Sequence, residues 1–151
     1  MKAKEEILQD WKRSRAYTES ILDAMPEEKG DYKPAGDVMS FRQQLLHILY
    51  AEEWFLRGMI EGNWEKSSAF APENHPDLAA VKDAFRTTTP LHESWISQIE
   101  DLEAKVKTPI SEQLITRKAL LMKLILHEAH HRGQLVIYLR MNGLTPPSFR
   151  I

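Results

Sequence analysis

Three of the six histidines in this 151-residue chain lie within five positions, in the segment LHEAHHRGQLV (residues 126–136). Residues four apart lie one turn apart on an α-helix and differ by about 40° around its axis. His127 and His131 can therefore direct two imidazoles at one metal ion. His130 is turned by about 100° from His131, so all three rings cannot easily converge. The spacing favours His127 and His131 as a pair of metal ligands.

The same histidines admit other interpretations, as surface residues or as buried groups satisfied by neighbours. HEAHH also matches HExxH, the motif of zinc metalloproteases in which the glutamate, here Glu128, acts as base. Those enzymes normally take a third ligand downstream, and residues 132–151 contain no His, Asp or Glu. Glu128 also lies four residues before Arg132, the favourable order for an ion pair on a helix surface. We expect that surface pair rather than a protease.

A third protein ligand must therefore come from upstream. His75 follows the residues PEN in a predicted loop, where we expect an exposed role. His92 occupies a position of the apolar stripe, which predicts either a cleft-lining residue or a satisfied buried histidine. His47 lies at the margin of an apolar stripe, and periodicity alone does not force it inward. Facing helices of a bundle approach to 8–10 Å, which would bring His47 within reach of the pair.

Small residues near these histidines also suggest close packing. Gly133 lies in mid-helix, where glycine costs about 1 kcal/mol relative to alanine. We therefore expect another group to approach closely beside His131. On the helix of His47, we expect Ala51 and Gly58 to permit the close approach of a facing helix.

The elements that must position these residues are helices. Ser40 and Gln43 form a capping-box motif, and Gly143 suits the end of a helix. The apolar phase persists across Pro90, which predicts one helix kinked there. No segment shows sustained period-two alternation. We predict an all-α fold, a four-helix bundle with long inter-helix loops, as a single domain over residues 1–151, with helices at about 4–25, 40–61, 78–106 and 116–142.

Composition restricts the partners. Twenty basic and 22 acidic side chains give a formal net charge of −2, which argues against nucleic acid. The basic cluster KRSR at 12–15 is interpreted as a solvated helix face. With no cysteine, the chain has no disulfide, no thiolate metal site and no thiol nucleophile of its own.

The first 15 residues contain no apolar segment of signal-peptide type, and no apolar run approaches the ~18 residues of a membrane span. We expect a cytoplasmic protein with no membrane partner.

Two segments, SFRQQLLHILYAEEWFLRGMIEG (40–62) and HEAHHRGQLVIYLRMNGLTPP (127–147), resemble the DinB/YfiT-like family of small helical metalloproteins. The resemblance covers essentially the whole chain, and the HxxxHRGQ block closed by Gly-x-x-Pro is its more specific part. It implies an up-down-down-up bundle, commonly homodimeric, with a divalent metal ion. The three-histidine site of the family falls on His47, His127 and His131. His130 and Glu128 do not match ligands.

The resemblance also implies a range of activities. Members with assigned activities include thiol-dependent S-transferases and isomerases that use bacillithiol, mycothiol or glutathione, and others carry a metal-dependent hydrolase label. We therefore expect a metal-dependent enzyme of one of these types, acting on a small-molecule substrate. The alternative is a non-catalytic metal-binding bundle that acts as a sensor or interaction module. Zn²⁺ is the expected ion, although Ni²⁺, Fe²⁺ and Mn²⁺ also suit imidazole ligands. The nucleophile would be water or a low-molecular-weight thiol co-substrate.

No residue is assigned a catalytic role from the sequence. Glu52 lies within an apolar stripe, where its carboxylate would be useful if it accepted a hydrogen bond from a ligand imidazole. The alternative is a glutamate at the stripe edge that reaches solvent. Four further residues are candidates to shape a substrate pocket, with core packing as the alternative for the aromatic ones: Trp54, Trp95, Tyr138 and His92.

Overall fold

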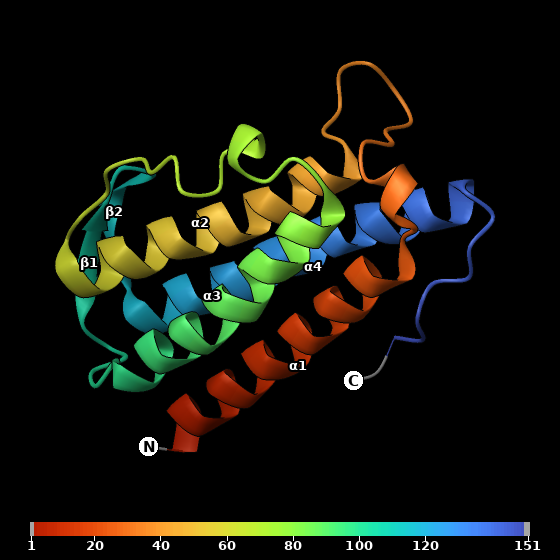
Figure 1. Cartoon of the computed structure of the whole chain (residues 1–151). Coiled ribbons are helices and arrows are strands. Elements are labelled where there is room, and N and C mark those ends of the chain that lie inside the picture. The colour runs from red at the N-terminus through yellow and green to blue at the C-terminus, as the bar shows by residue number, and fades with distance from the viewer. Residues whose placement is uncertain (1, 150–151) are drawn as a thin grey trace.

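The structure, a computed structural model, describes residues 2–149. Four long helices dominate it: α1 (Lys2–Ala24), α2 (Phe41–Glu61), α3 (Leu78–Gln98) and α4 (Arg117–Met141). The connections carry two short 3₁₀ helices, η1 (Glu27–Lys29) and η2 (Pro72–Asn74), and an antiparallel hairpin of β1 (Lys105–Thr108) and β2 (Ser111–Thr116) (Figure 1). The predicted four-helix bundle is confirmed.

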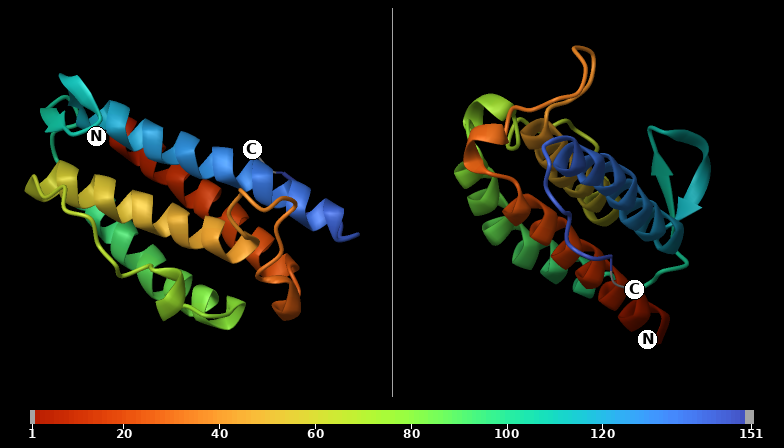
Figure 2. Two further views of the ribbon diagram at one scale, coloured as in Figure 1. Left: turned by 90° about the horizontal axis from the view of Figure 1, so that it is seen from above. Right: turned by 90° about the vertical axis from the view of Figure 1, so that its right-hand side faces the viewer.

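The helices run up, down, down and up. Figures 1 and 2 show α1 and α4 running in one direction and α2 and α3 in the other. Residues 62–77 pass back along the bundle, so that α3 starts at the same end as α2. Both α1 and α2 pack against α3 and against α4. Thus α1 and α2 occupy opposite corners of the bundle, and α4 lies beside α2.

Local sequence features explain where the helices begin and end. The Ser40 side chain accepts a hydrogen bond from the Gln43 amide, and the Gln43 side chain returns one from the Ser40 amide, which is the predicted capping box of α2. The Thr116 hydroxyl caps α4 in a similar way. After α4, Gly143 has a φ of +73°, a conformation that favours glycine. A single helix passes through Pro90, which confirms the predicted continuity, while the kink stays a prediction.

The end of α3 and the hairpin differ from the prediction. The third helix was expected to reach residue 106, but it ends at Gln98. The Asp101 carboxylate accepts hydrogen bonds from the backbone N–H groups of Glu103 and Ala104, which favours a turn over a helix. Val106 instead pairs with Ile115 across the hairpin. Its side chain still packs against the core, so the apolar spacing persisted without a helix.

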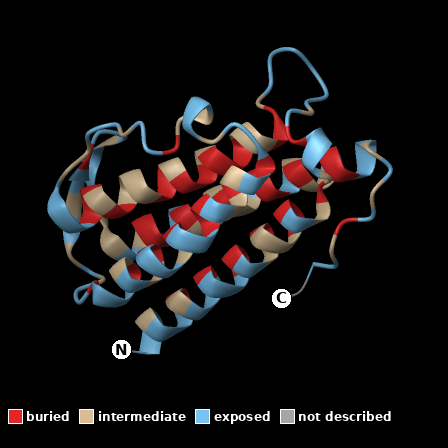
Figure 3. Cartoon of the chain, viewed as in Figure 1, coloured by how far each residue is buried: buried red, intermediate tan, exposed pale blue. Residues whose placement is uncertain are grey.

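Buried side chains form three successive layers along the bundle. Figure 3 shows that they line the sides of the helices that face one another. One apolar cluster includes Leu22 and Leu139, and a second includes Trp11 and Leu120. Between these positions, every helix contributes buried polar groups: Ser14, Arg15, Thr18, Glu52, Thr88, His92, Glu128, His131 and Arg132. Within residues 2–149, no helix is long and apolar enough to cross a membrane.

Candidate metal centre

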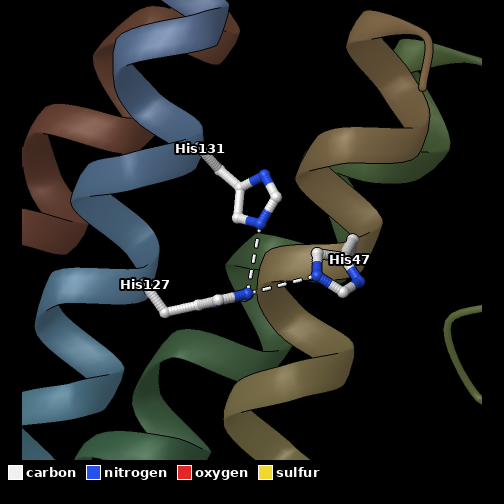
Figure 4. A group of neighbouring side chains, drawn as sticks. All are labelled: His47, His127 and His131. Carbon is white, nitrogen blue, oxygen red and sulfur yellow. Dashed lines mark hydrogen bonds between the residues drawn. The ribbon is translucent and has the colours of Figure 1, made fainter. Parts of the chain in front are cut away.

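Three histidines from two adjacent helices converge on one point. His47 comes from the first half of α2, and His127 and His131 lie one turn apart on α4. The Nε2 atom of His127 is 3.2 Å from Nε2 of His47 and 3.1 Å from Nε2 of His131 (Figure 4). One nitrogen of each ring lies within 4.8 Å of the other two. The structure thus brings together the residues that the resemblance indicated, and their role as ligands stays a prediction.

The geometry of this histidine cluster fits a divalent ion. Zn–N bonds of about 2.0–2.1 Å in a tetrahedral site keep two ligand nitrogens about 3.3 Å apart. The observed Nε2 separations of 3.1 and 3.2 Å are close to that spacing. Three imidazoles leave a fourth coordination position for a ligand from outside the protein, as catalytic zinc sites do. The donor set therefore suits zinc and the other ions that imidazole binds.

Hydrogen bonds behind His131 determine which of its nitrogens carries the hydrogen. The Tyr138 hydroxyl donates to the Met39 carbonyl oxygen at 2.8 Å, so its oxygen accepts from Gln44 Nε2 at 3.0 Å. The Gln44 amide is thereby oriented with Oε1 toward His131, 2.8 Å from Nδ1. Because Oε1 only accepts, Nδ1 must donate. The neutral ring of His131 then presents the Nε2 lone pair to the cluster.

Burial also keeps the cluster uncharged. Loss of solvent lowers the pKa of His127 to about 4, and the neighbouring His47 adds to the effect. Burial, followed by the proximity of His127, lowers the pKa of His131 to about 4 as well. The pKa of His47 is lowered by burial alone. All three rings are therefore neutral at neutral pH, which is the state that binds a metal ion.

The other three histidines lie outside this cluster. His130 is exposed and contacts the Gln134 side chain at 3.1 Å. A ring nitrogen of His75 lies 2.9 Å from the Ala69 carbonyl oxygen, within the connection between α2 and α3. His92 is fully buried in the polar layer. His92 is therefore buried, as one of its two expectations required, but it is only partly satisfied, because Nε2 has no hydrogen-bond partner within the described residues.

Glu52 is buried as one hypothesis required, but its partners differ from the expected ones. Its carboxylate accepts hydrogen bonds from Trp11 Nε1 at 2.7 Å, Arg15 Nη2 at 2.7 Å and His92 Nδ1 at 2.6 Å. None of these is a histidine of the cluster. Burial would raise the pKa of the Glu52 carboxyl, but the Arg15 charge and the bonds from His92 and Trp11 lower it to about 2. Glu52 is an ionised residue of the core.

Arg15 is the residue that the sequence interpretation missed. KRSR was expected on a solvated face, yet only Lys12 and Arg13 are exposed, while Ser14 and Arg15 are buried. Besides Glu52, Arg15 binds Glu128, with Nε 3.0 Å from Oε1. The spacing of Arg15 could have predicted its burial, because Arg15 lies one turn after the buried Trp11 on the same stripe of α1. We predicted an exposed side chain because arginine is charged.

The predicted surface pair of Glu128 and Arg132 is also wrong. Both side chains are buried. Glu128 pairs with Arg15, and Arg132 Nη1 donates a hydrogen bond to the Ser14 carbonyl oxygen at 3.0 Å. The metalloprotease interpretation needs Glu128 beside the metal, whereas Arg15 holds this carboxylate in the core. The structure therefore disfavours a protease as well.

The expectation for Gly133 is wrong too. Gly133 is exposed, and a Cβ atom added there would meet nothing within 4 Å. No group of the described chain approaches His131 through this position. Close packing beside His131 comes instead from Gln44 of α2.

A cavity of about 490 Å³ adjoins His47. It lies between the start of α2 and two stretches of the connections, at residues 36–39 and 67–72. Its apolar lining includes Leu46, Tyr50 and Phe70, while its polar lining includes Asp37 and Gln43. None of the four predicted pocket residues (Trp54, Trp95, Tyr138 and His92) lines it. Trp54 packs on Trp64 and Trp95 on His92, and Tyr138 acts through Gln44.

The metal-free protein is expected to bind about one divalent ion per chain, because the cluster offers a single set of three nitrogens. His47→Ala, His127→Ala and His131→Ala should each abolish stoichiometric zinc binding, measured by equilibrium dialysis and elemental analysis. His130→Ala is the matched control on the same helix and should bind normally. Equal losses in His130→Ala and His131→Ala would contradict the assignment.

Gln44→Leu is expected to weaken zinc binding by about 10–100-fold, the usual effect of removing a group that orients a ligand histidine. The substitution removes the acceptor for His131 Nδ1–H but leaves the three imidazoles in place. Competition with a chromophoric chelator measures the affinity, with Gln9→Leu on the exposed face of α1 as the control. An unchanged affinity in Gln44→Leu would show that the hydrogen bond does not matter to the site.

The dependence of fold stability on pH in the acid range should reveal that Glu52 is ionised in the folded protein. Its pKa falls from 4.5 to about 2 on folding, so the carboxylate stabilises the fold above pH 4.5 and loses this effect as the pH falls toward about 2. Burial lowers the pKa of His92, but its hydrogen bonds to Glu52 and Glu53 raise it overall, so in the native chain this ring stays protonated across that window. The free energy of unfolding of the native chain relative to Glu52→Gln should fall by on the order of 3 kcal/mol across the window. Urea denaturation measures it, and a constant difference would contradict an ionised Glu52.

Comparisons with known proteins agree with this fold. YjoA of Bacillus subtilis, an uncharacterised protein, is 26% identical over 145 residues, which is 95% of this chain and 94% of YjoA. The crystal structure of the DinB-like YjoA matches with a TM-score of 0.78 at 23% identity, covering 95% of this chain and 96% of the other. A DinB-like protein from Bacillus cereus ATCC 10987 matches with a TM-score of 0.82 at 24% identity, covering 97% of each chain.

A more distant structural match is YfiT from Bacillus subtilis, with a TM-score of 0.70 at 15% identity, over 94% of this chain and 89% of the other. YfiT is described as a probable metal-dependent hydrolase with an unusual four-helix bundle topology. The DinB family model matches residues 1–151, the whole of this sequence. The chain belongs to the DinB family.

Proposed function

We propose that this protein is a metal-dependent enzyme of the hydrolase type, with the ion held by His47, His127 and His131. The observation that carries the proposal is the convergence of three neutral imidazoles, one of which, His47, lines a cavity of about 490 Å³. A structural metal site is normally closed by four protein ligands, whereas three ligands beside a cavity suit catalysis. The description of YfiT as a probable metal-dependent hydrolase supports the same class.

Some residues of the chain would hold the ion, and others, in the lining of the cavity, would bind the substrate. When bound, a divalent ion of this kind supplies Lewis-acid chemistry, polarising an oxygen atom and promoting the loss of a proton from water or a thiol. Gln44 keeps His131 in the tautomer that exposes Nε2. Tyr50, stacked against His47 with ring centroids 6.3 Å apart, and Phe70 offer apolar surface to a small substrate. Gln43 and Asp37 offer it polar contacts.

A second candidate is a thiol-dependent S-transferase or isomerase. It is favoured by the state of the two buried glutamates, because Glu52 and Glu128 bind Arg15 and are not available as a base at the cluster. A thiol that ionises on binding to a metal needs no such base. Since the chain has no cysteine, the thiol would be a low-molecular-weight co-substrate. Zn²⁺ is the proposed ion in both cases.

The decisive experiment measures turnover by the zinc-loaded protein in two assays. One assay offers a panel of small esters, and the other offers electrophiles together with a low-molecular-weight thiol. The proposal predicts ester hydrolysis without thiol, lost on chelation and restored by zinc. His131→Ala should lack it, whereas His130→Ala should retain it.

Turnover of electrophiles that requires the thiol, without ester hydrolysis, would replace the hydrolase proposal by the transferase one. The absence of turnover in both assays with one zinc ion bound per chain would overturn the enzyme proposal. A non-catalytic metal-binding module would then take its place.

A further inference from the structure

A second cavity, of about 600 Å³, lies at the other end of α2. It is open to solvent and is bordered by the last turn of α2, the segment that follows, the β-hairpin and the start of α4. Figure 1 shows the hairpin beside this end of the helix. Met59 lines the cavity and lies twelve residues after His47, which corresponds to about 18 Å along a helix. This hairpin cavity is therefore separate from the histidine cluster.

We propose that the hairpin cavity binds a small amphiphilic anion, a molecule that joins a carboxylate, phosphate or sulfonate group to a flat apolar body. The first argument is charge. Lys105, Lys107 and Arg117 line the cavity, and no acidic side chain does. The ion pairs formed within residues 2–149 involve none of the three cations. In a chain of net charge −2, this is a local positive site.

The second argument is a pair of polar atoms without partners. Thr108 is only 4% exposed, yet its Oγ1 has no hydrogen-bond partner in the part of the chain that the structure describes. The same holds for the buried Nε of Arg117, while its Nη1 donates to the Asp101 carbonyl oxygen at 3.5 Å. Buried donors are rarely left unpaired in native proteins. A hydroxyl and a guanidinium edge are donors that suit the oxygens of a carboxylate or phosphate.

The third argument is the apolar wall. Trp64 lies against Gly58 so closely that a Cβ atom there would be 2.3 Å from the indole ring. Gly58 therefore admits the indole of Trp64 rather than a facing helix, which corrects the expectation for this glycine. Trp54 Nε1 donates to the Trp64 carbonyl oxygen at 2.8 Å and anchors the segment. Met59 and Val106 add further apolar surface beside the cations, which suits a ligand with one charged end and one flat apolar part.

The test compares two probes of similar size and shape, the anionic 1-naphthalenesulfonate and its uncharged sulfonamide, by isothermal titration calorimetry. The sulfonate should bind with one molecule per chain, and the sulfonamide should bind at least about tenfold more weakly. Arg117→Gln and the double variant Lys105→Gln/Lys107→Gln should each weaken the sulfonate by about tenfold. Lys118→Gln, on an exposed residue next to Arg117 that does not line the cavity, should bind as the native chain does.

Amide chemical shifts of the native protein give a readout that does not depend on any variant. Titration with the sulfonate should shift residues 58–64 and 105–109, and leave the surroundings of His47 unchanged. His47→Ala should bind the sulfonate normally. Equal binding of both probes, shifts centred on His47, or no binding at millimolar concentration would each overturn the proposal.

Discussion

The guanidinium of Arg15, buried between two carboxylates, is the contact on which the arrangement of the helices depends. Its Nη2 lies 2.7 Å from Glu52 of α2, and its Nε lies 3.0 Å from Glu128 of α4. Because α1 and α2 stand at opposite corners, the side chain spans the core. Removing one partner of a buried pair leaves an uncompensated charge and costs about 3–5 kcal/mol. The two helices that Arg15 joins are those that carry the histidine cluster.

The buried polar layer also constrains how the helices can slide. It lies between two apolar clusters, so a shift of one helix along its axis would set a charged group against leucine side chains. We infer that the ion pairs set the register of the bundle, a use attested for buried polar groups in other helical assemblies. Glu128 follows His127 in sequence and points to Arg15, while His127 points to His47. One turn of α4 therefore contributes both to the polar core and to the histidine cluster.

Helical periodicity and capping predicted the four helices, and the spacing of His127 and His131 predicted a shared target. His47 was a candidate because a bundle brings helices close together, but periodicity did not place it inward, and the resemblance alone selected it as the third ligand. Arg15 was missed because a charged residue was assumed to be solvated. The hairpin was missed because β1 and β2 are short and Val106 kept a helical phase. Each cavity is lined partly by α2 and partly by connections or the hairpin, and these last segments carry no helical pattern from which their approach to α2 could be predicted.

The two cavities lie at opposite ends of α2 and are lined by side chains of different chemical character. The one beside His47 has imidazole at its edge and no basic side chain in its lining, while the hairpin cavity has three cations and no histidine. X-ray absorption of the zinc-loaded protein tests most directly whether the first of these is a three-histidine metal centre. Such a centre predicts three imidazole nitrogens at about 2.0–2.1 Å, completed by ligands from outside the protein. A coordination sphere with at most one imidazole, or one made mainly of carboxylate oxygens, would contradict it.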